Sequence, residues 1–277
     1  MKLFPSRSAL LDCALGIVPV LIFALAIRSG APRPSSEQLI RVATAQLPPQ
    51  MNSKGEGQEA KIIIAALRAG GVKADIVFDA MPFTRHWKAF AANNRYAAVT
   101  TVPEELKLDG LRSKVYVNYQ NGIFYKTAAF PNGLGKDALT ALSNRKVVAF
   151  AGAATILPGV RSASHSSIEY LEQKDQQSHT VLFVNDKVDL VIADELIFAQ
   201  YTREYLGADY AKTADATAFD PVFCPTPYHL VFREDSLRDA FDAGLASIRS
   251  DGTLDDIEKT YATGTGITKV SRQNQGC

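Results

Sequence analysis

The sequence predicts an α/β protein built from mostly parallel sheets that are flanked by helices. Helical and strand-like patterns alternate without a gap through residues 55–102, and such alternation implies a parallel sheet covered by helices. The segments 93–99 and 185–191 repeat one pattern, in which a polar turn leads into a buried strand and an acidic residue follows. This echo predicts two halves of similar topology.

The first half of the chain carries clear helical and strand periods. In 59–69 the apolar residues Ile63, Ala66 and Leu67 recur at helical spacing, and the glycine pair that follows can end the helix without a Cβ. Thr84 is placed to cap a second helix. In chain order we expect a strand at 39–45, a helix at 59–69, a strand at 74–78, a helix after Thr84, a strand at 97–102 and a strand within 115–126.

The second half continues the alternation. The run VDLVIA at 188–193 is the clearest buried strand, and Leu237, Phe241, Leu245 and Ile248 form the apolar face of an amphipathic helix. In chain order we expect a helix at 139–142, a strand at 146–150, a polar helix at 166–174, strands at 180–184 and 188–193, a helix at 195–205, strands at 220–223 and 228–233, and helices at 236–249 and 254–261.

Composition excludes several classes of protein. With 277 residues, 47% hydrophobic and 21% charged, the chain is long enough for one large or two smaller globular domains. Its net charge is +1, which gives no electrostatic case for binding nucleic acid. The four histidines are scattered without metal-ligand spacing and no CxxC motif is present, so we expect neither a metal site nor another cofactor.

The first 30 residues have the layout of a leader. Lys2 and Arg7 precede an uncharged apolar stretch at 13–27, which ends in small residues. This is typical of a secretory signal peptide cleaved near Ala26 or Ala31. An uncleaved membrane anchor is the alternative, and Asp12 counts against both interpretations because a charge is costly in lipid.

Cysteine is sparse in the chain. After loss of the leader, which contains Cys13, the sequence retains Cys224 and Cys277. These two can pair in an oxidising compartment, or they can be two unrelated thiols; their spacing does not decide between the two.

A helix, the polar turn 93–95, a strand with Thr100 and Thr101, and then Pro103-Glu104 together resemble the first lobe of bacterial periplasmic solute-binding proteins of family 3. These are the polar-amino-acid-binding proteins of ABC importers. The segment 82–85, Pro-Phe-Thr-Arg, is similar to a Pro-aromatic-x-Arg segment of one branch, and Asp-Gly-Thr at 251–253 resembles the family's C-terminal end. The resemblance covers most of the chain after residue 38.

The resemblance implies the two-lobed periplasmic-binding-protein fold of type II. Lobe one would span 38–126 and return at 221–265, lobe two would span 127–220, and 266–277 would be a tail. Hinge motion about crossings near 123–126 and 220–223 would close the lobes on a ligand. A family member would be an exported, monomeric protein that delivers a small polar, amino-acid-like solute to an ABC transporter permease in the inner membrane.

A small zwitterionic solute needs donors for its carboxylate, a carboxylate for its ammonium group and an aromatic wall for its body. The resemblance and this chemistry together select Gln46, Phe83, Arg85, Thr100, Thr101, Tyr119, Thr155 and Asp194 as the expected ligand-binding residues. Asp194 follows a buried strand, where it can meet a ligand ammonium. It can equally cap the helix 195–205, and both roles can hold together.

One position departs from the family pattern. Amino-acid-binding members usually carry an Arg after the Pro-Glu pair to clamp the α-carboxylate, and this chain has Glu105 there. Arg85 or Arg112 can compensate only if the fold brings them to the cleft. The ligand is therefore expected to be cationic, neutral or something other than an ordinary amino acid.

Two further functions are compatible with this pattern. A ligand-sensing binding protein would act in trans on a partner, and a dehydratase-like enzyme on the same fold would need an acid of raised pKa in the cleft, with Glu105 or Glu195 as candidates. We expect a binding protein rather than an enzyme, because no nucleophile and base are placed to form an active site.

Overall fold

The computed structural model of the chain describes residues 39–135, 137–261, 266 and 268–269. The leader expected at 1–30 lies outside the described residues. No helix within the described residues is long and apolar enough to cross a membrane. Cys224 is disulfide-bonded, while Cys13 and Cys277 both lie outside the described residues.

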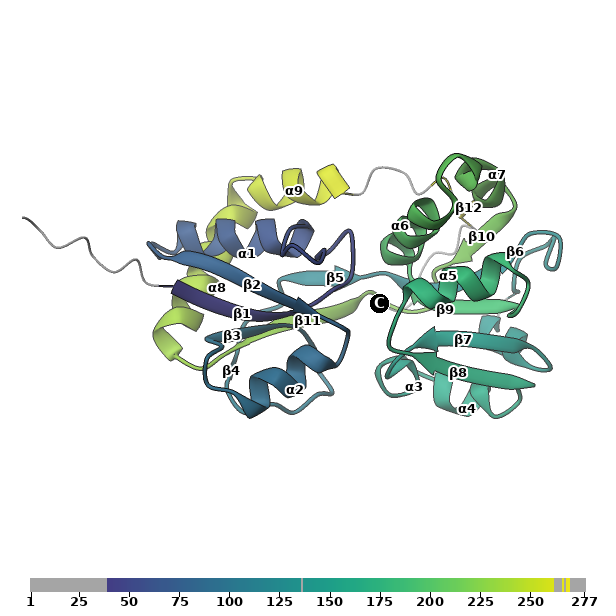
Figure 1. Cartoon of the computed structure of the whole chain (residues 1–277), viewed down its shortest axis with the longest axis horizontal. Coiled ribbons are helices and arrows are strands. Elements are labelled where there is room, and N and C mark those ends of the chain that lie inside the picture. Colours follow the sequence, from purple (N-terminus) through teal and green to yellow (C-terminus); the bar gives the residue numbers. More distant parts are fainter. Residues whose placement is uncertain (1–38, 136, 262–265, 267, 270–277) are drawn as a thin grey trace, which may run out of the picture. The chain divides into compact units, whose positions relative to one another are not determined.

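The first of two sheets begins with the helix and strand alternation that the sequence predicts (Figure 1). Its strands run in the order β2-β1-β3-β11-β4, with β5 paired to β11. Strands β1, β2 and β3 are parallel, and β11 is antiparallel to β3. The elements are β1 (Leu39–Ala45), α1 (Gln58–Ala69), β2 (Asp75–Met81), α2 (Arg85–Ala92), β3 (Ala98–Pro103), β4 (Leu111–Arg112), β5 (Val117–Tyr119) and β11 (Thr226–Phe232).

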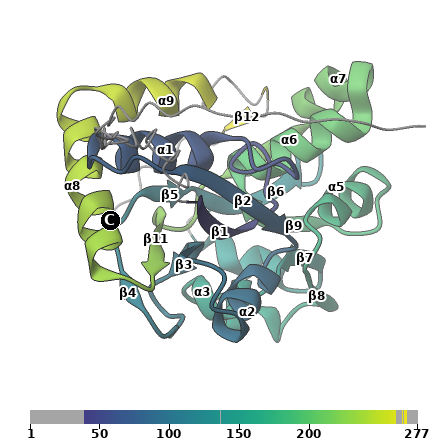
Figure 2. The ribbon, with the colours of Figure 1, turned by 60° about the vertical axis from the view of Figure 1, so that its left-hand side comes forward.

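Helices cover both faces of this sheet. Helix α1 packs with α8 (Asp235–Ser250) and α9 (Thr253–Tyr261) on one face, and α2 lies on the other (Figures 1 and 2). Helices α1 and α8 cross closely, since a Cβ added at Gly244 would lie 1.8 Å from the carbonyl oxygen of Ala66. Glycine at 244 therefore allows the two backbones to approach.

The second sheet has the order β12-β10-β6-β9-β7-β8. Strands β7, β8 and β9 are parallel, whereas β6 runs antiparallel to both β9 and β10. Its elements are β6 (Asn121–Lys126), η1 (Ala138–Leu142), β7 (Lys146–Phe150), α3 (Ala153–Ile156), α4 (Val160–Ser164), β8 (Glu169–Gln173), α5 (Gln177–Val184), β9 (Leu190–Asp194), α6 (Glu195–Leu206), η2 (Gly207–Asp209), α7 (Tyr210–Asp215), β10 (Thr217–Asp220) and β12 (Thr268–Lys269).

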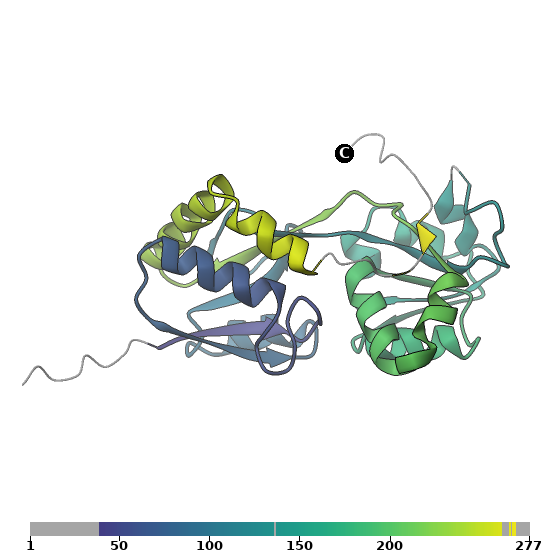
Figure 3. The same ribbon diagram turned by 90° about the horizontal axis from the view of Figure 1, so that it is seen from above.

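Between β5 and β11, the chain passes from the first sheet to the second and back again (Figure 3). It leaves the first sheet at Gln120, between β5 and β6, and returns through residues 221–225, between β10 and β11. The two passages are joined, because the Gln120 side chain donates to the carbonyl of Phe223 (3.0 Å) and Asn121 donates to Thr226 (2.9 Å). The first passage thus precedes the crossing expected at 123–126, since β6 already pairs with β9 and β10.

Two expected elements of the second half have the opposite type. The segment predicted as a polar helix at 166–174 contains the strand β8, which pairs only with β7 at the sheet edge. An edge strand tolerates polar side chains because one side of it faces solvent. The segment predicted as a strand at 180–184 belongs to helix α5, whose buried residues His179, Thr180 and Phe183 pack toward the sheet. Packing there overrides the β propensity of Thr, Val and Phe.

One expected helix cap is also absent. Thr84 precedes α2, but it has a positive φ of 69° and makes no capping hydrogen bond through its side chain. The α/β fold class, in contrast, is confirmed by the two helix-flanked sheets. In the second sheet, the rings of Phe124, Phe198 and Phe219 pack together between the strands and α6.

Candidate ligand-binding site

A small cavity lies where the two sheets face each other. Its volume is about 10 Å³, which is close to the space of one water molecule. Its walls are formed by Leu47, Phe83, Tyr119 and Tyr228 from the first lobe, and by Asn121, Phe150, Gln176, Asp194 and Ile197 from the second. The cavity is therefore shared between the lobes, and in this conformation side chains nearly fill it.

The position of the cavity follows from strand direction. Leu47 and Phe83 come shortly after the ends of β1 and β2, while Phe150 and Asp194 are the last residues of β7 and β9. The carboxyl ends of parallel strands are where α/β sheets bind ligands. The cavity thus lies at the strand ends, which is the usual place of a ligand site in an α/β sheet.

Asp194 is the acidic group of the cavity wall. Its side chain is buried, with 3% of the residue exposed, and its Oδ1 accepts hydrogen bonds from the amides of Leu196 and Ile197, both at 3.0 Å. The expected capping of α6 is therefore confirmed. Burial raises the pKa of Asp194 to about 7. The amide hydrogen bonds act in the opposite direction, because they favour the ionised carboxylate, but their effect is smaller.

Four aromatic rings line the cavity together with Asp194. Phe83 and Phe150 meet across the two lobes, with ring centroids 6.2 Å apart and planes at 84°. On the first lobe Tyr119 and Tyr228 contact each other at 4.6 Å between centroids. This wall can enclose the body of a small solute and can also attract a cation through the ring faces.

Behind the cavity, Tyr119 belongs to a buried polar network. Its hydroxyl donates to the carboxylate of Glu59, near the start of α1, and Thr101 Oγ1 donates to the same carboxylate at 3.1 Å. Thr101 Oγ1 also lies 3.0 Å from Thr100 Oγ1, which in turn lies 2.8 Å from Thr44 Oγ1. The network links the ends of β1 and β3 to the start of α1.

Glu59 is the charged centre of this network. Only 1% of the residue is exposed, and this burial raises the pKa of Glu59, while hydrogen bonds from Tyr119, Tyr116 and Thr101 lower it. Thr101 meets the carboxylate with a φ of 55°, an uncommon conformation for a β-branched residue. Such strained backbone persists where the surrounding contacts fix it.

The structure separates the sequence-predicted site residues into three groups. Phe83, Tyr119 and Asp194 line the cavity. Thr100 and Thr101 are buried in the network behind Tyr119. The other three, Gln46, Arg85 and Thr155, are exposed and do not line the cavity.

Sequence reasoning missed Gln176, Phe150, Asn121 and Tyr228 as cavity residues. Gln176 follows strand β8. Because the polar sequence of that segment predicts a helix, nothing in the sequence indicates that Gln176 lies beyond the end of a strand. Glu59 was also missed as a buried acid. Its position in the first turn of a helix is ordinary for an acidic residue, and nothing local reveals the three hydroxyl groups that surround it.

Backbone amides after β7 and at the start of α6 could bind an anion, but they are already used within the protein. In the small-residue run after β7, the amides of Gly152 and Ala154 donate to the carboxylate of Glu172 at 2.7 and 2.8 Å. Thr155 accepts a hydrogen bond from Arg161 at 2.9 Å. The first amides of α6 donate to Asp194, as described above, and the amide of Glu195 donates to the carbonyl of Gln120.

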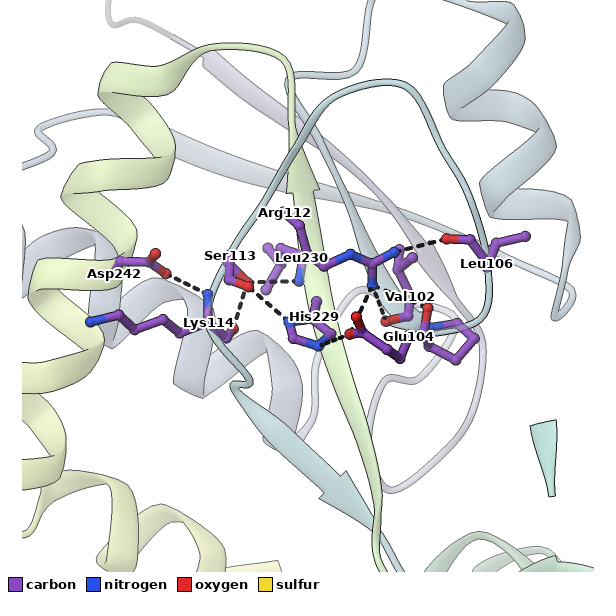
Figure 4. A network of polar contacts seen from close by, with 10 residues as sticks. Val102, Glu104, Leu106, Arg112, Ser113, Lys114, His229, Leu230 and Asp242 are labelled. Atoms are coloured by element: carbon purple, nitrogen blue, oxygen red, sulfur yellow. Dashed lines mark hydrogen bonds and ion pairs between the residues drawn. The ribbon is translucent and has the colours of Figure 1, made fainter. Parts of the chain in front are cut away.

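Neither arginine that could replace the missing clamp lines the cavity. Arg112 donates to the carbonyl oxygens of Pro103 (3.1 Å) and Leu106 (2.8 Å), and lies 4.0 Å from Glu104. Figure 4 shows this network, in which Glu104 also lies 3.0 Å from Nε2 of His229. Arg112 therefore holds the loop after β3, and Arg85 is exposed at the start of α2.

A metal site is not part of this arrangement. Across the described residues, no three His, Cys, Asp or Glu side chains gather so that they could hold a metal ion. The polar groups of the cavity are instead those that bind small organic molecules: one carboxylate, two amide side chains and two phenol groups.

No family model and no curated protein matches the sequence. Many solved structures nevertheless resemble the fold. An amino acid ABC transporter substrate-binding protein, AbpA from Streptococcus pneumoniae, bound to L-arginine, has a TM-score of 0.61 at 17% identity, over 84% of this chain and 98% of that one.

Two other matches are linked by their descriptions to an enzyme and to a sensor. The ancestral amino acid-binding protein AncCDT-1, a precursor of cyclohexadienyl dehydratase, has a TM-score of 0.62 at 15% identity. The match covers 80% of this chain and 94% of the AncCDT-1 chain. A histidine kinase sensor domain with similarity to periplasmic binding proteins has a TM-score of 0.60 at 16% identity, over 82% and 97%. The resemblance seen in the sequence is confirmed at the level of the fold: this chain has the two-lobed α/β fold of the periplasmic amino-acid-binding proteins.

Proposed function

We propose that the chain is an exported solute-binding protein that captures a small polar solute between its lobes and delivers it to an ABC importer in the inner membrane. The observation that carries the proposal is the position of Asp194, a buried carboxylate at the end of β9, on a cavity wall shared with Phe83 and Tyr119. The fold shared with an ABC transporter substrate-binding protein supports the same function.

The solute would carry an ammonium or similar cationic group. Asp194 is held in place by two amides of α6, so its carboxylate is oriented before the ligand arrives. The aromatic rings would cover the rest of the solute and exclude water, which strengthens the charge pair. Phe83, Tyr119 and Asp194 are thus the predicted contacts that keep a direct role in this proposal.

Binding requires the lobes to move apart. The cavity of about 10 Å³ is too small for an amino-acid-sized molecule. Among the described residues, the passages at Gln120 and 221–225 connect the lobes. A rotation about both passages would open the cleft, and closure would then trap the solute. Exchange between open and closed forms is what an importer component needs to load and release its cargo.

The first test is a thermal-shift screen of the purified protein against amino acids, polyamines, organic acids and small peptides. A ligand at 100 times its dissociation constant stabilises the folded state by about 2.7 kcal/mol. The matched variant is Asp194→Asn, because Asn is as good a helix cap as Asp and removes the charge alone. A hit that this variant loses supports the proposal, and a screen without any hit contradicts it.

An enzyme on the same fold is the second candidate, and one observation favours it. Asp194 has its pKa raised to about 7 within the cavity, which suits a general acid near neutral pH. The acids that the sequence suggested do not line the cavity: Glu105 is exposed and Glu195 is buried at the start of α6. Recovery of the bound ligand and mass spectrometry decide between the classes, since an intact ligand indicates binding and a product of altered mass indicates an enzyme.

Transport and sensing are separated in cells. If the chain serves an importer, deletion of its gene abolishes uptake of the radiolabelled ligand, and the protein is found in the periplasmic fraction. Normal uptake combined with a lost transcriptional response to the ligand would instead indicate a sensor that acts in trans.

A further inference from the structure

The cavity wall is acidic and lacks a positive partner. Of the nine described residues that form it, Asp194 carries a carboxylate, and none is Lys, Arg or His. A ligand carboxylate placed there would be desolvated beside Asp194 without a cation to offset the cost. The charge of the wall therefore selects against acids and in favour of cations.

Several donors near the strand ends are already used within the described part of the protein. The amides of Leu196 and Ile197 donate to Asp194, and those of Gly152 and Ala154 donate to Glu172. Arg112 donates to carbonyl oxygens of the loop after β3. These donors are thus already paired with acceptors of the protein.

Gln176 adds an unpaired acceptor to the same wall. The residue is 6% exposed and lines the cavity, and its Oε1 has no hydrogen-bond partner among the described residues. A buried carbonyl oxygen without a donor is costly, and a ligand N–H can satisfy it. The wall therefore presents two acceptors, Asp194 and Gln176, to a bound solute.

The aromatic rings restrict the class of cation further. Phe83, Phe150, Tyr119 and Tyr228 surround the cavity and can bind a cation through their faces. A quaternary ammonium ion would use the rings but has no N–H for Gln176. A primary ammonium or guanidinium group can use the rings and both acceptors.

We propose that the solute is an organic amine or guanidine without an α-carboxylate, whose N–H groups bind Asp194 and Gln176 inside the aromatic wall. This inference rests on the proposed solute-binding function and narrows it to one ligand class. It assigns to Gln176 a part in recognition: the residue accepts a hydrogen bond from the solute, while Asp194 supplies the opposite charge.

The test is isothermal titration calorimetry with matched pairs that differ by the carboxylate alone. Agmatine is compared with arginine, cadaverine with lysine, and choline is included as the quaternary cation. For at least one pair, we expect the dissociation constant of the amine to be at least about ten times lower than that of its amino acid. If arginine or lysine binds as tightly as its amine, the inference is overturned but solute binding stands. If none of the five compounds binds and the broader screen also finds no ligand, the result counts against solute binding itself.

A variant tests the role of Gln176 separately. Gln176→Leu keeps the volume and removes the acceptor, and we expect the dissociation constant of the preferred amine to rise about three- to tenfold, as for loss of one neutral hydrogen bond. The control is Gln177→Leu, at the exposed neighbouring position in α5, which should bind as the wild type does. Unchanged affinity in Gln176→Leu would overturn the contact, and tighter binding of choline than of any primary amine would overturn the requirement for N–H donors.

Discussion

The hydroxyl group of Tyr119 donates a hydrogen bond to the carboxylate of Glu59, so a ring on the cavity wall is fixed by a buried acid of the first lobe. The same carboxylate accepts from Thr101, within β3. The cavity wall and this strand are therefore positioned together, and a change at either residue affects both.

Removal of this hydroxyl group should destabilise the protein. In Tyr119→Phe the buried carboxyl of Glu59 loses one of its donors, which costs about 1–3 kcal/mol when the acceptor cannot reach water. Chemical denaturation measures the change in the free energy of unfolding. Tyr205→Phe is the control, because Tyr205 is 43% exposed and should change stability by less than about 0.5 kcal/mol; equal effects in the two variants would contradict the importance of the network.

Asp194 should make the protein less stable as the pH rises. Its pKa is raised from 3.8 to about 7 by burial, so the folded state holds this proton more tightly than the unfolded chain does. The free energy of unfolding should therefore fall between about pH 4 and pH 7, by up to about 4 kcal/mol for a shift of this size. Comparison with Asp194→Asn isolates the contribution, since Glu59, whose pKa is also raised, changes stability in the same direction.

The measurement is the difference in unfolding free energy between wild type and Asp194→Asn at pH 4, 5, 6 and 7. We expect the variant to gain stability relative to the wild type at each step. A difference that stays constant with pH would mean that Asp194 titrates at its ordinary pKa in the folded protein.

Affinity for a cationic ligand should show the opposite trend. An ammonium group binds the ionised carboxylate. Below pH 7, Asp194 must therefore lose its proton when the ligand binds, which weakens the observed affinity. The dissociation constant should fall up to tenfold per pH unit as the pH rises toward 7, and should level off above it. Calorimetry of the best ligand from pH 5 to pH 8 measures this dependence. The titratable groups that interact with Asp194 are Glu195 and Tyr228. A flat profile would argue against a charge pair with Asp194.

A methyl group at Gly244 should destabilise the first lobe. In an exposed helix, Gly→Ala stabilises by about 1 kcal/mol, but a Cβ at this position would lie 1.8 Å from the carbonyl oxygen of Ala66 and 2.6 Å from the amide of Gly70. Because both atoms belong to the backbone, α1 and α8 must move apart, at a cost of about 1–3 kcal/mol. Thermal unfolding measures the change, with Ser247→Ala on the exposed side of α8 as the control; a stabilised Gly244→Ala would show that the two helices separate easily.

Much of the fold could be predicted because its strongest signals are local. The strand at 39–45, the helix at 59–69 and the Asp194 cap depend on spacing within a few residues, and the structure has all three. The segment 166–184 was mispredicted because its outcome depends on neighbours. The polar residues of β8 are acceptable at a sheet edge, and Thr180 of α5 is buried against α6, where its Oγ1 lies 3.1 Å from that of Thr202.

The candidate site was less accessible than the fold for the same reason. Asp194, Phe83 and Tyr119 lie beside recognisable strand ends, and the structure brings them to one cavity. Gln46, Arg85 and Thr155 also lie near strand ends or helix starts, but their side chains are exposed. Side-chain direction there depends on contacts from the other lobe and from distant loops, which local spacing does not encode.

The hydrogen bonds from Gly152 and Ala154 to Glu172 have a consequence for competition among solutes. Glu172 is a residue of β8, which pairs with β7 in the same sheet. Its carboxylate is therefore a ligand of those amides that the chain itself holds in place. Tethering over a short distance corresponds to an effective concentration in the millimolar range or above. A free amino acid at micromolar concentration could not displace Glu172, and the protein would therefore ignore such acids even where they greatly outnumber its own ligand.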